Sequence, residues 1–304
     1  TVPITAVFSS NWNQHGNVQI EEQTMYAGWR LRMRRGRRLS AWILGGKMSF
    51  EAQDLIEQAI KRHGDRICVN WSGGRDSTAV LHMALKINPR IKVIFGNTRC
   101  ESGETWAYIR KLYREWEINL FMTTPEKTFW QCADEYGLPK VRNSDSDCRT
   151  PKCCYFLKEK PIDDMKKRLG VTAYFTGLMK DESHQRFLTL SRYDRPGQSQ
   201  DEISFCAQRY YKKSTNEWAY HPIANWSSED IDRYFKENDL PVNQFYVKWG
   251  GIYKRSGCLL CTAYLSWENK LKISHPYAYK RLKARKLAEQ ENRFHDPGKL
   301  GMWV

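Results

Sequence analysis

Short apolar segments alternate with longer amphipathic segments from residue 66 to about residue 177, and this alternation constrains the fold more than any other feature. The short segments, at 66–71, 91–97, 118–123 and 172–177, have the length and the β-branched and aromatic content of strands. The segments between them show helical spacing of apolar residues. Regular alternation of strand and helix predicts an α/β fold with a doubly wound parallel sheet and right-handed crossovers.

The pattern divides the chain into three regions. We expect a basic and aromatic N-terminal extension at 1–48, an α/β domain at 49–225 and a helical C-terminal segment at 226–304 that contains a Cys-x-x-Cys motif. The extension combines arginines with tryptophans, which is typical of nucleic-acid-binding arms, and a solvated charged hairpin or part of an interface is the alternative. Its arginines are Arg30, Arg32, Arg34, Arg35, Arg37 and Arg38.

The composition indicates a folded protein with an anionic partner. Hydrophobic residues make up 41% of the 304 residues, and the net charge is +15. Because phosphates attract Lys and Arg, a nucleic acid is the first partner that this charge suggests. No apolar run reaches the ~18 residues of a membrane span, and the first residues lack the pattern of a signal peptide. We therefore expect a cytoplasmic protein without membrane contact.

The turn "SGGRDS" at 72–77 joins the strand at 66–71 to a helix that begins near Asp76. In a doubly wound sheet, ligands bind at such a junction, beside the carboxyl ends of strands and the N-termini of helices. Two glycines allow the backbone N–H groups to approach an oxyanion closely, and Ser72 and Ser77 add hydroxyl donors. The glycine spacing fits neither a Walker A loop nor a GxGxxG fingerprint. The turn therefore predicts an anion site or, alternatively, a plain structural corner.

The whole string resembles the SGGxDS loop of the PP-loop ATP pyrophosphatase superfamily, which includes the sulfonucleotide reductases. The resemblance implies that the loop binds the β and γ phosphates of ATP, with Ser72, Asp76 and Ser77 as the catalytic residues. It also implies that Asp76 holds Mg²⁺ or caps the helix, and that Asn97 lies where the nucleoside is recognised. The implied phosphate-binding residues are Ser72, Gly73, Gly74, Arg75, Asp76 and Ser77.

The nine cysteines include a Cys153–Cys154 pair and a Cys-x-x-Cys motif at Cys258 and Cys261. Without a signal peptide, clustered cysteines indicate metal or redox chemistry more than disulfides. Four thiolates suit either a tetrahedral Zn²⁺ or a [4Fe–4S] cluster. The stretch "CCYFLKEKPI" is similar to the cluster motif of adenylyl-sulfate reductases, and this resemblance implies that the four cysteines ligate a [4Fe–4S] cluster.

Three of the remaining cysteines and one further stretch complete the set of candidates. We expect Cys68 to lie in the core, whereas Cys100 and Cys148 are candidate reactive thiols. The stretch "TGLMKDESHQR" resembles the superfamily segment that faces the anionic end of the nucleotide, which implies anion contacts for Lys180 and Arg186.

Two features separate the chain from sulfonucleotide reductases. The loop at 72–77 is intact, and no cysteine follows Cys261 to act as the nucleophile that a reductase carries near its C-terminus. The chain resembles most the ATP pyrophosphatase of DNA phosphorothioation systems, the DndC or SspD type. That resemblance implies adenylation of a DNA backbone phosphate, release of pyrophosphate, and sulfur from a cysteine desulfurase acting with other modification-system subunits.

Other functions remain open at this point. A tRNA thiolation enzyme of the same superfamily would share the loop, the cluster and the basic charge but act on RNA. A (phospho)adenylyl-sulfate reductase would need a thiol from elsewhere in the chain, and a DNA-binding regulator would not need an intact loop.

Overall fold

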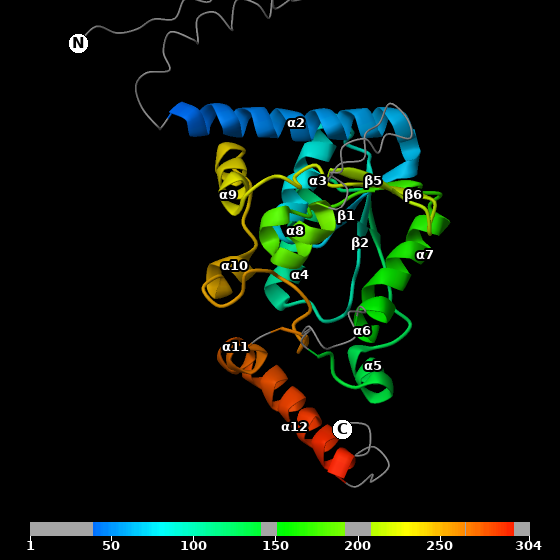
Figure 1. Ribbon diagram of the computed structural model, residues 1–304, viewed down its shortest axis with the longest axis vertical. Coiled ribbons are helices and arrows are strands. Elements are labelled where there is room, and N and C mark those ends of the chain that lie inside the picture. Colours follow the sequence, from blue (N-terminus) through cyan, green and yellow to red (C-terminus); the bar gives the residue numbers. More distant parts are fainter. Residues whose placement is uncertain (1–38, 141–150, 192–207, 265, 295–304) are drawn as a thin grey trace, which may run out of the picture. The chain divides into compact units, whose positions relative to one another are not determined.

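The computed structural model describes residues 39–140, 151–191, 208–264 and 266–294 (Figure 1). The chain divides into two compact units, Thr1–Gly46 and Lys47–Val304, and the second contains the sheet and every described site residue. The arginines of the predicted N-terminal extension, and also Cys148 and Cys206, lie outside the described residues. The predicted boundaries at residues 48 and 225 remain predictions.

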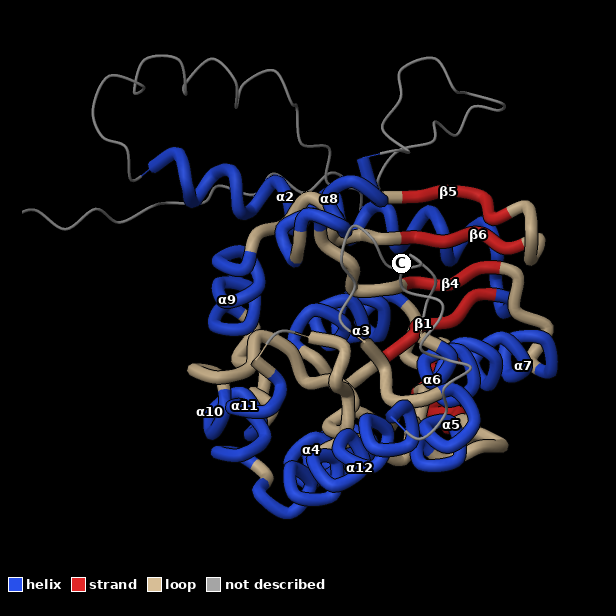
Figure 2. The backbone as a smooth tube through the Cα atoms, turned by 60° about the horizontal axis from the view of Figure 1, so that its bottom comes forward, coloured by secondary structure: helices blue, strands red, loops and turns tan. Residues whose placement is uncertain are grey.

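Six strands form a single sheet in the order β3-β2-β1-β4-β6-β5 (Figure 2). The central strand β1 pairs in parallel with β2 through Val69 and Val93, and with β4 through Val69 and Phe175. Only the pairing of β5 with β6 is antiparallel among the described strands, so the predicted α/β class is confirmed as a mixed, mostly parallel sheet. The strands are β1 Ile67–Trp71, β2 Lys92–Phe95, β3 Leu120–Met122, β4 Ala173–Phe175, β5 Arg209–Lys212 and β6 Glu217–Tyr220.

Strands β5 and β6 were not expected from the sequence. Each has four residues, and polar residues at 213–216 separate them, so neither forms a run that stands out as a strand. The residues of β5 are all only half-buried, which explains their lack of apolar alternation. An antiparallel edge strand corrects the expectation of a purely parallel sheet.

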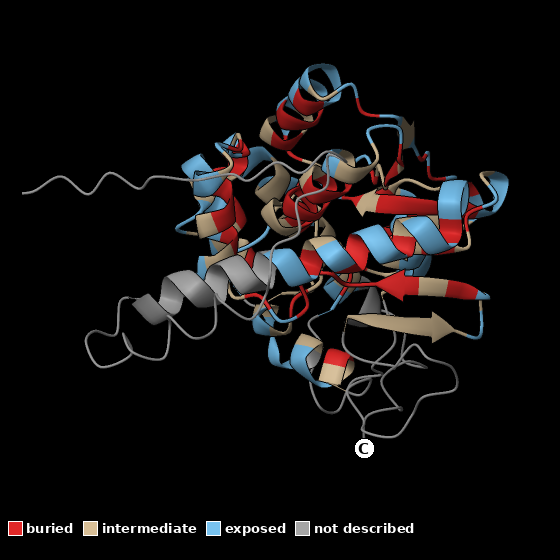
Figure 3. Cartoon of the chain, turned by 90° about the horizontal axis from the view of Figure 1, so that it is seen from above, coloured by how far each residue is buried: buried red, intermediate tan, exposed pale blue. Residues whose placement is uncertain are grey.

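Helices cover both faces of the sheet and bury its apolar side chains (Figures 1 and 3). One face packs against α2 Leu39–His63, α3 Arg75–Ile87, α4 Gly103–Glu115 and α9 Ser228–Glu237, with Trp71 and Phe95 among its buried residues. The other face packs against α7 Lys160–Arg168 through a smaller cluster that includes Cys68 and Ile94. The prediction that Cys68 belongs to the core is therefore correct.

The remaining helices lie in the connections and in the C-terminal segment. A third apolar cluster joins α5 and the cysteine-bearing segments to α11 and α12. Their bounds are η1 Gly64–Arg66, α5 Phe129–Tyr136, α6 Lys152–Cys154, η2 Tyr155–Glu159, η3 Lys180–Glu182, α8 His184–Ser191, α10 Gln244–Trp249, α11 Trp267–Ser274 and α12 Pro276–Phe294.

The turns that follow β1, β2 and β4 meet at the carboxyl edge of the sheet because these strands are parallel neighbours. The turn after β4 contacts the first turn of α3 closely: a Cβ added at Gly177 would lie 2.5 Å from the Ser77 nitrogen. Among the described residues, no helix has both the length and the apolar character needed to cross a membrane.

Candidate functional site

The turn at 72–74 and the N-terminus of α3 form a cradle of backbone N–H groups. Gly73 adopts a left-handed conformation with φ of +71°, which only glycine takes without strain. Gly74 is the N-cap of α3, and no side chain caps the helix there. The N–H groups of the first turn therefore remain available to an anion, and the helix dipole adds positive potential. We call residues 72–77 the phosphate loop, after the role that the sequence predicts for it.

The two serines of the phosphate loop bind mainly to the loop itself. Their hydroxyl oxygens lie 3.0 Å apart, and the Ser77 hydroxyl donates to the Gly74 carbonyl at 3.1 Å. Ser77 is buried, whereas Ser72 is exposed. Ser72 is thus positioned to contact a ligand directly, and Ser77 holds the shape of the turn.

Asp76 lies in the first turn of α3 and faces a set of charged groups. Burial, with the Glu182 carboxylate as the next cause, raises the pKa of Asp76 to about 6, while Arg75, Arg255 and Arg186 oppose this rise. The alternative role of Asp76 as the helix cap is wrong, because the helix starts at Arg75 with Gly74 as its N-cap. A partly desolvated carboxylate among arginines suits a metal or anion site.

Two arginines from distant segments converge beside Asp76. Arg186 on α8 pairs with Glu182 at 3.5 Å, and Arg255 pairs with the other oxygen of the same carboxylate at 3.8 Å. Burial lowers the pKa of Arg186, and the Glu182 carboxylate opposes that effect. Arg186 was predicted as an anion contact and lies in this group. Arg255 was not predicted, although a basic residue just before the Gly257–Cys258 pair was a usable signal.

The hydrogen bonds of Lys180 and Asn97, the other two predicted nucleotide contacts, give less support to such a role. Lys180 begins the short helix η3, and its backbone N–H donates to the Ala224 carbonyl at 2.9 Å. The Asn97 side chain accepts from the Arg99 N–H at 2.9 Å and so stabilises its own turn.

One carboxylate oxygen of Glu101 accepts two hydrogen bonds from Thr98, whereas the other is buried without a described protein partner. Glu101 is therefore an additional acceptor at this edge of the sheet.

Arg75, at the variable position of the loop, points away toward α9 and α10. Its guanidinium pairs with Asp232 and lies 5.4 Å from the centre of the Tyr246 ring. These contacts make Arg75 an anchor of the loop rather than a free cation.

The structure brings together all four predicted metal-ligating cysteines. Cys153 is in hydrogen-bond contact with Cys154 and interacts electrostatically with Cys261, which in turn neighbours Cys154. Cys258 interacts electrostatically with Cys261, and the backbone N–H of Cys261 donates to the Cys258 carbonyl at 3.2 Å. Elements more than 100 residues apart in the sequence thus deliver their thiols to one place.

Two cysteines that were not assigned as ligands adjoin this group. Cys100, buried after the turn that follows β2, is in hydrogen-bond contact with Cys258, and its carbonyl accepts from the Leu259 N–H at 2.7 Å. Cys132 on α5 interacts electrostatically with both Cys153 and Cys100. We call these six residues the cysteine group.

The cysteine group contains the thiol ligands that a metal requires, but the structure does not arrange them around one metal position. Contact with Cys154 and burial raise the pKa of Cys153, contact with Cys100 and burial raise that of Cys258, and burial raises that of Cys261. Such crowding disfavours thiolates unless a cation compensates them. Among the described residues, no three His, Cys, Asp or Glu side chains already surround a metal position.

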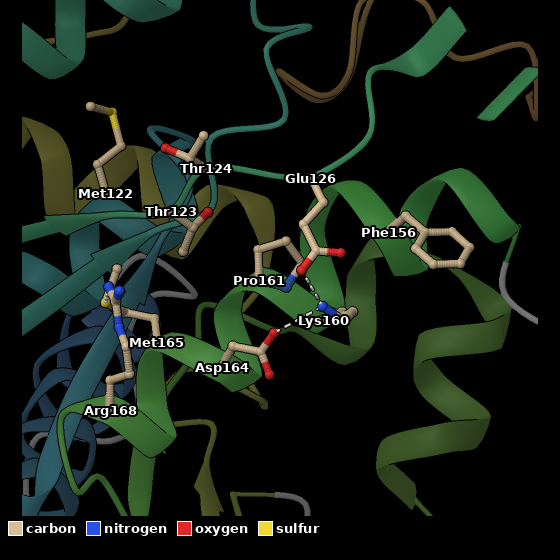
Figure 4. Close-up of a pocket in the computed structure, with 10 residues that line it drawn as sticks. All are labelled: Met122, Thr123, Thr124, Glu126, Phe156, Lys160, Pro161, Asp164, Met165 and Arg168. Carbon is tan, nitrogen blue, oxygen red and sulfur yellow. Dashed lines mark hydrogen bonds and ion pairs between the residues drawn. The ribbon is translucent and has the colours of Figure 1, made fainter. Parts of the chain in front are cut away.

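A separate cavity of about 200 Å³ lies between the end of β3 and α7 (Figure 4). Figure 4 shows the Lys160 ammonium between the carboxylates of Glu126 and Asp164, at 2.8 and 3.2 Å. The cavity contains none of the predicted site residues, and its acids and bases largely neutralise each other. We therefore take the phosphate loop and the cysteine group as the candidate functional site.

Comparison with known proteins identifies the family. Residues 66–264 match the phosphoadenosine phosphosulfate reductase domain. An adenosine 5'-phosphosulfate reductase of Streptomyces coelicolor is 29% identical over 211 residues, covering 69% of this chain and 77% of the relative. The enzyme of the same name from Staphylococcus haemolyticus is 24% identical over 213 residues, covering 70% and 76%. A solved phosphoadenylyl-sulfate reductase from Candida auris, with 16% identity, covers 77% of this chain and 95% of its own, with a TM-score of 0.47.

These findings overturn the prediction of a DNA phosphorothioation enzyme. The relatives carry the name of the reductase, which was the alternative. The prediction depended on a cysteine missing after Cys261, but the position of a thiol along the chain does not determine which thiol reaches the substrate. Cys100, for example, interacts with Cys258 across 158 residues of sequence. The match over residues 66–264, well over half of the chain, shows that this protein belongs to the phosphoadenosine phosphosulfate reductase domain family.

Proposed function

We propose that the protein is a sulfonucleotide reductase that binds adenylyl sulfate at the phosphate loop and releases AMP and sulfite. The observation that carries this proposal is the position of one anion site, the uncapped N-terminus of α3 with Arg186 and Arg255, next to a second site made of thiols. Arg255 joins the two sites, because it interacts electrostatically with both Asp76 and Cys261. The names of the relatives support the same substrate.

The proposed chemistry needs an anion held still while its sulfur is reduced. The N–H groups of the phosphate loop and the two guanidinium groups offset the charge of the phosphosulfate. A thiolate then bonds to the sulfate sulfur while AMP leaves with the bridging oxygen. A second thiol attacks the first, so that sulfite leaves and a disulfide forms, and an added dithiol reduces this disulfide.

Cys100 is our first candidate for the attacking thiol among the described residues. It lies outside the four proposed ligands, contacts the Cys258 thiol and follows the turn at Asn97. A Cys100→Ser variant should keep its bound metal but lose sulfite formation. Metal analysis and a sulfite assay on the same preparation separate these two effects.

We propose a [4Fe–4S] cluster on Cys153, Cys154, Cys258 and Cys261, with zinc as the less favoured occupant. When bound, it supplies the positive charge that these crowded thiolates lack. The residues of this chain hold the thiols close to Arg255 and thus close to the anion site.

The decisive experiment is anaerobic incubation with adenylyl sulfate and a dithiol, with sulfite and AMP measured together. Wild-type protein should form both in equal amounts. Arg186→Ala and Arg255→Ala should lower kcat/KM by about tenfold to a hundredfold, since each removes a charged contact to the anion. Arg114→Ala removes an exposed arginine of α4 and serves as the matched control. Absence of sulfite from metal-loaded wild-type protein would refute the proposal.

Cleavage of ATP to AMP and pyrophosphate is a second candidate that one observation favours. The left-handed Gly73 and the uncapped helix leave a cradle suited to a β,γ-diphosphate, with Asp76 beside it to hold Mg²⁺. Pyrophosphate release from ATP and Mg²⁺ without sulfite release from adenylyl sulfate would favour this activity. A nucleic-acid partner and a cysteine desulfurase remain predictions from the basic charge and the earlier resemblance.

A further inference from the structure

The side chain of Tyr246, on α10, contacts both the phosphate loop and the segment that carries Cys258 and Cys261. Its hydroxyl oxygen lies 3.1 Å from the Ser256 hydroxyl oxygen and accepts a hydrogen bond of 3.1 Å from the Ser256 N–H. A Cβ added at Gly74 would lie 3.4 Å from the same tyrosine oxygen. One hydroxyl group therefore packs against the phosphate loop and binds the residue two positions before Cys258.

Helix α10 is also fixed to the phosphate loop by its own N-cap. The buried Asn243 side chain donates to the Gly73 carbonyl at 3.0 Å and to the Thr105 hydroxyl at 3.2 Å. The Arg75 guanidinium carbon lies over the Tyr246 ring, 5.4 Å from the ring centre. Contacts at Gly73 and Arg75 therefore hold α10 to the phosphate loop.

On its other side, the segment with the thiols has few described anchors. Ser256 is held by Tyr246, and Leu259 is held by the Cys100 carbonyl. Cys258 lies between these two anchors, and beyond Cys261 the Thr262 hydroxyl donates to the Pro139 carbonyl at 2.5 Å. Loss of the Ser256 anchor therefore loosens the backbone on the N-terminal side of the Cys258 thiol. The ion pair of the neighbouring Arg255 with the shared Glu182 carboxylate is long, at 3.8 Å, and is a weaker constraint.

We propose that Tyr246 is a positioning residue that couples occupancy of the phosphate loop to the reactivity of Cys258 and Cys261. The inference rests on the proposed function, because it requires an adenine nucleotide at that loop. A bound anion fixes the N–H groups that follow Gly74, which holds the Tyr246 hydroxyl on Ser256 and restrains the thiols. By thermodynamic linkage, the factor by which nucleotide strengthens binding of a group to the thiols is also the factor by which that bound group strengthens nucleotide binding.

The test compares thiol labelling with and without nucleotide on the protein as purified under anaerobic conditions, with a metal chelator in every sample, so that labelling reports how fast Cys258 and Cys261 are released from bound metal. Iodoacetamide labelling of Cys258 and Cys261 is followed by peptide mass spectrometry, and binding of adenylyl sulfate is measured separately by calorimetry without a dithiol. Saturating nucleotide should slow labelling of wild-type protein by about fivefold or more. Tyr246→Phe keeps the ring over Arg75 and removes only the hydroxyl, so slowing should fall below about twofold while the nucleotide still binds.

Two further variants make the outcome decisive. Tyr253→Phe is the matched control, because it removes a similar hydroxyl contact, 2.9 Å to Ser274, without touching the phosphate loop, and it should behave as wild type. Ser256→Ala removes one partner of the Tyr246 hydroxyl and should weaken the slowing even if Tyr246→Phe folds poorly. Full slowing in both Tyr246→Phe and Ser256→Ala, or nucleotide binding without slowing in wild type, overturns the coupling alone. Absence of nucleotide binding in wild type overturns the proposed function and the coupling with it.

Discussion

At the scale of single residues, Asp76 should make folding stability depend on pH in an unusual direction. Its pKa is raised from 3.8 to about 6, chiefly by burial, so the folded state holds the proton more tightly than the unfolded state. Stability therefore falls as pH rises from about 4 to about 6, where the folded protein gives up this proton. Asp76→Asn removes the effect and should gain on the order of 2 kcal/mol over wild type at pH 7, but little at pH 4.

Urea unfolding at several pH values measures this difference directly, because the midpoints can be compared at a constant slope. A stability difference between Asp76→Asn and wild type that stays constant from pH 4 to pH 7 would show that the Asp76 carboxyl is not desolvated as the structure indicates.

The sequence predicted some of the site residues and could not predict others. The phosphate loop and the four cysteines belong to short local motifs, so they were found. Tyr246 and Asn243 matter through contacts with Arg75 and Gly73, more than 100 residues away, and no local pattern marks them. Arg255 faces Asp76 across a similar separation, and its place before Gly257 was its one local signal. Cys100 was noticed only as a reactive candidate, because its contact with Cys258 depends on how two loops meet.

At the scale of elements, the turn after β4 should tolerate no side chain where it meets α3. In Gly177→Ala, the new Cβ would lie 2.5 Å from the Ser77 nitrogen and 2.6 Å from the Asp76 carbonyl carbon, both backbone atoms. The first turn of α3 must shift, so we expect a loss of about 1–3 kcal/mol of stability and weaker nucleotide binding. Gly103→Ala, whose Cβ meets nothing within 4 Å, is the control. Equal nucleotide affinity in both variants would contradict the proposed cradle.

A buried ion pair should hold α7 to β6. The Lys166 ammonium lies 2.7 Å from Glu217 and 2.8 Å from Asp163, and Lys166 is only 2% exposed. Lys166→Met leaves the Glu217 carboxylate buried without its cation, so the free energy of unfolding should fall by about 3–5 kcal/mol. Lys166→Met/Glu217→Leu should recover much of this loss, because no charge then remains buried.

The exposed pair of Lys111 and Glu115 on α4, 3.9 Å apart, provides the control for this prediction. Lys111→Met should change the free energy of unfolding by less than about 1 kcal/mol, because water already solvates both charges. Denaturant unfolding of all variants at one pH checks the set, and a small effect of Lys166→Met would mean that water reaches Glu217.

The sequence predicted the central elements of the fold better than its edges. The helix expected near Asp76 begins at Arg75, and all four expected strands are present within a few residues of their predicted bounds. The apolar runs of β1, β2 and β4 reflect burial on both faces of the sheet. The half-exposed edge strand β5 needs no such run, and β6, although mostly buried, has only four residues and begins with the polar Glu217.

At the scale of the whole molecule, the stability of the α/β domain and that of the C-terminal segment should depend on each other through the cysteine group. The sheet side supplies Cys153 and Cys154, and the C-terminal side supplies Cys258 and Cys261. A metal cluster bound by all four stabilises only the state in which both parts are docked, so its loss should lower the thermal midpoint of the whole chain.

Iron content gives the sharpest form of this prediction. Protein purified without oxygen should hold about four iron atoms per chain, and Cys258→Ala should lose most of them and melt at a lower temperature. Cys68→Ala is the matched control: this thiol is fully buried between the sheet and α7, so its removal should cost only about 1 kcal/mol and leave the iron in place. Iron analysis and a melting curve on each preparation separate the two effects. One zinc atom in place of iron would keep the four-thiolate site but refute the cluster, whereas full iron in Cys258→Ala would remove that residue from the ligand set.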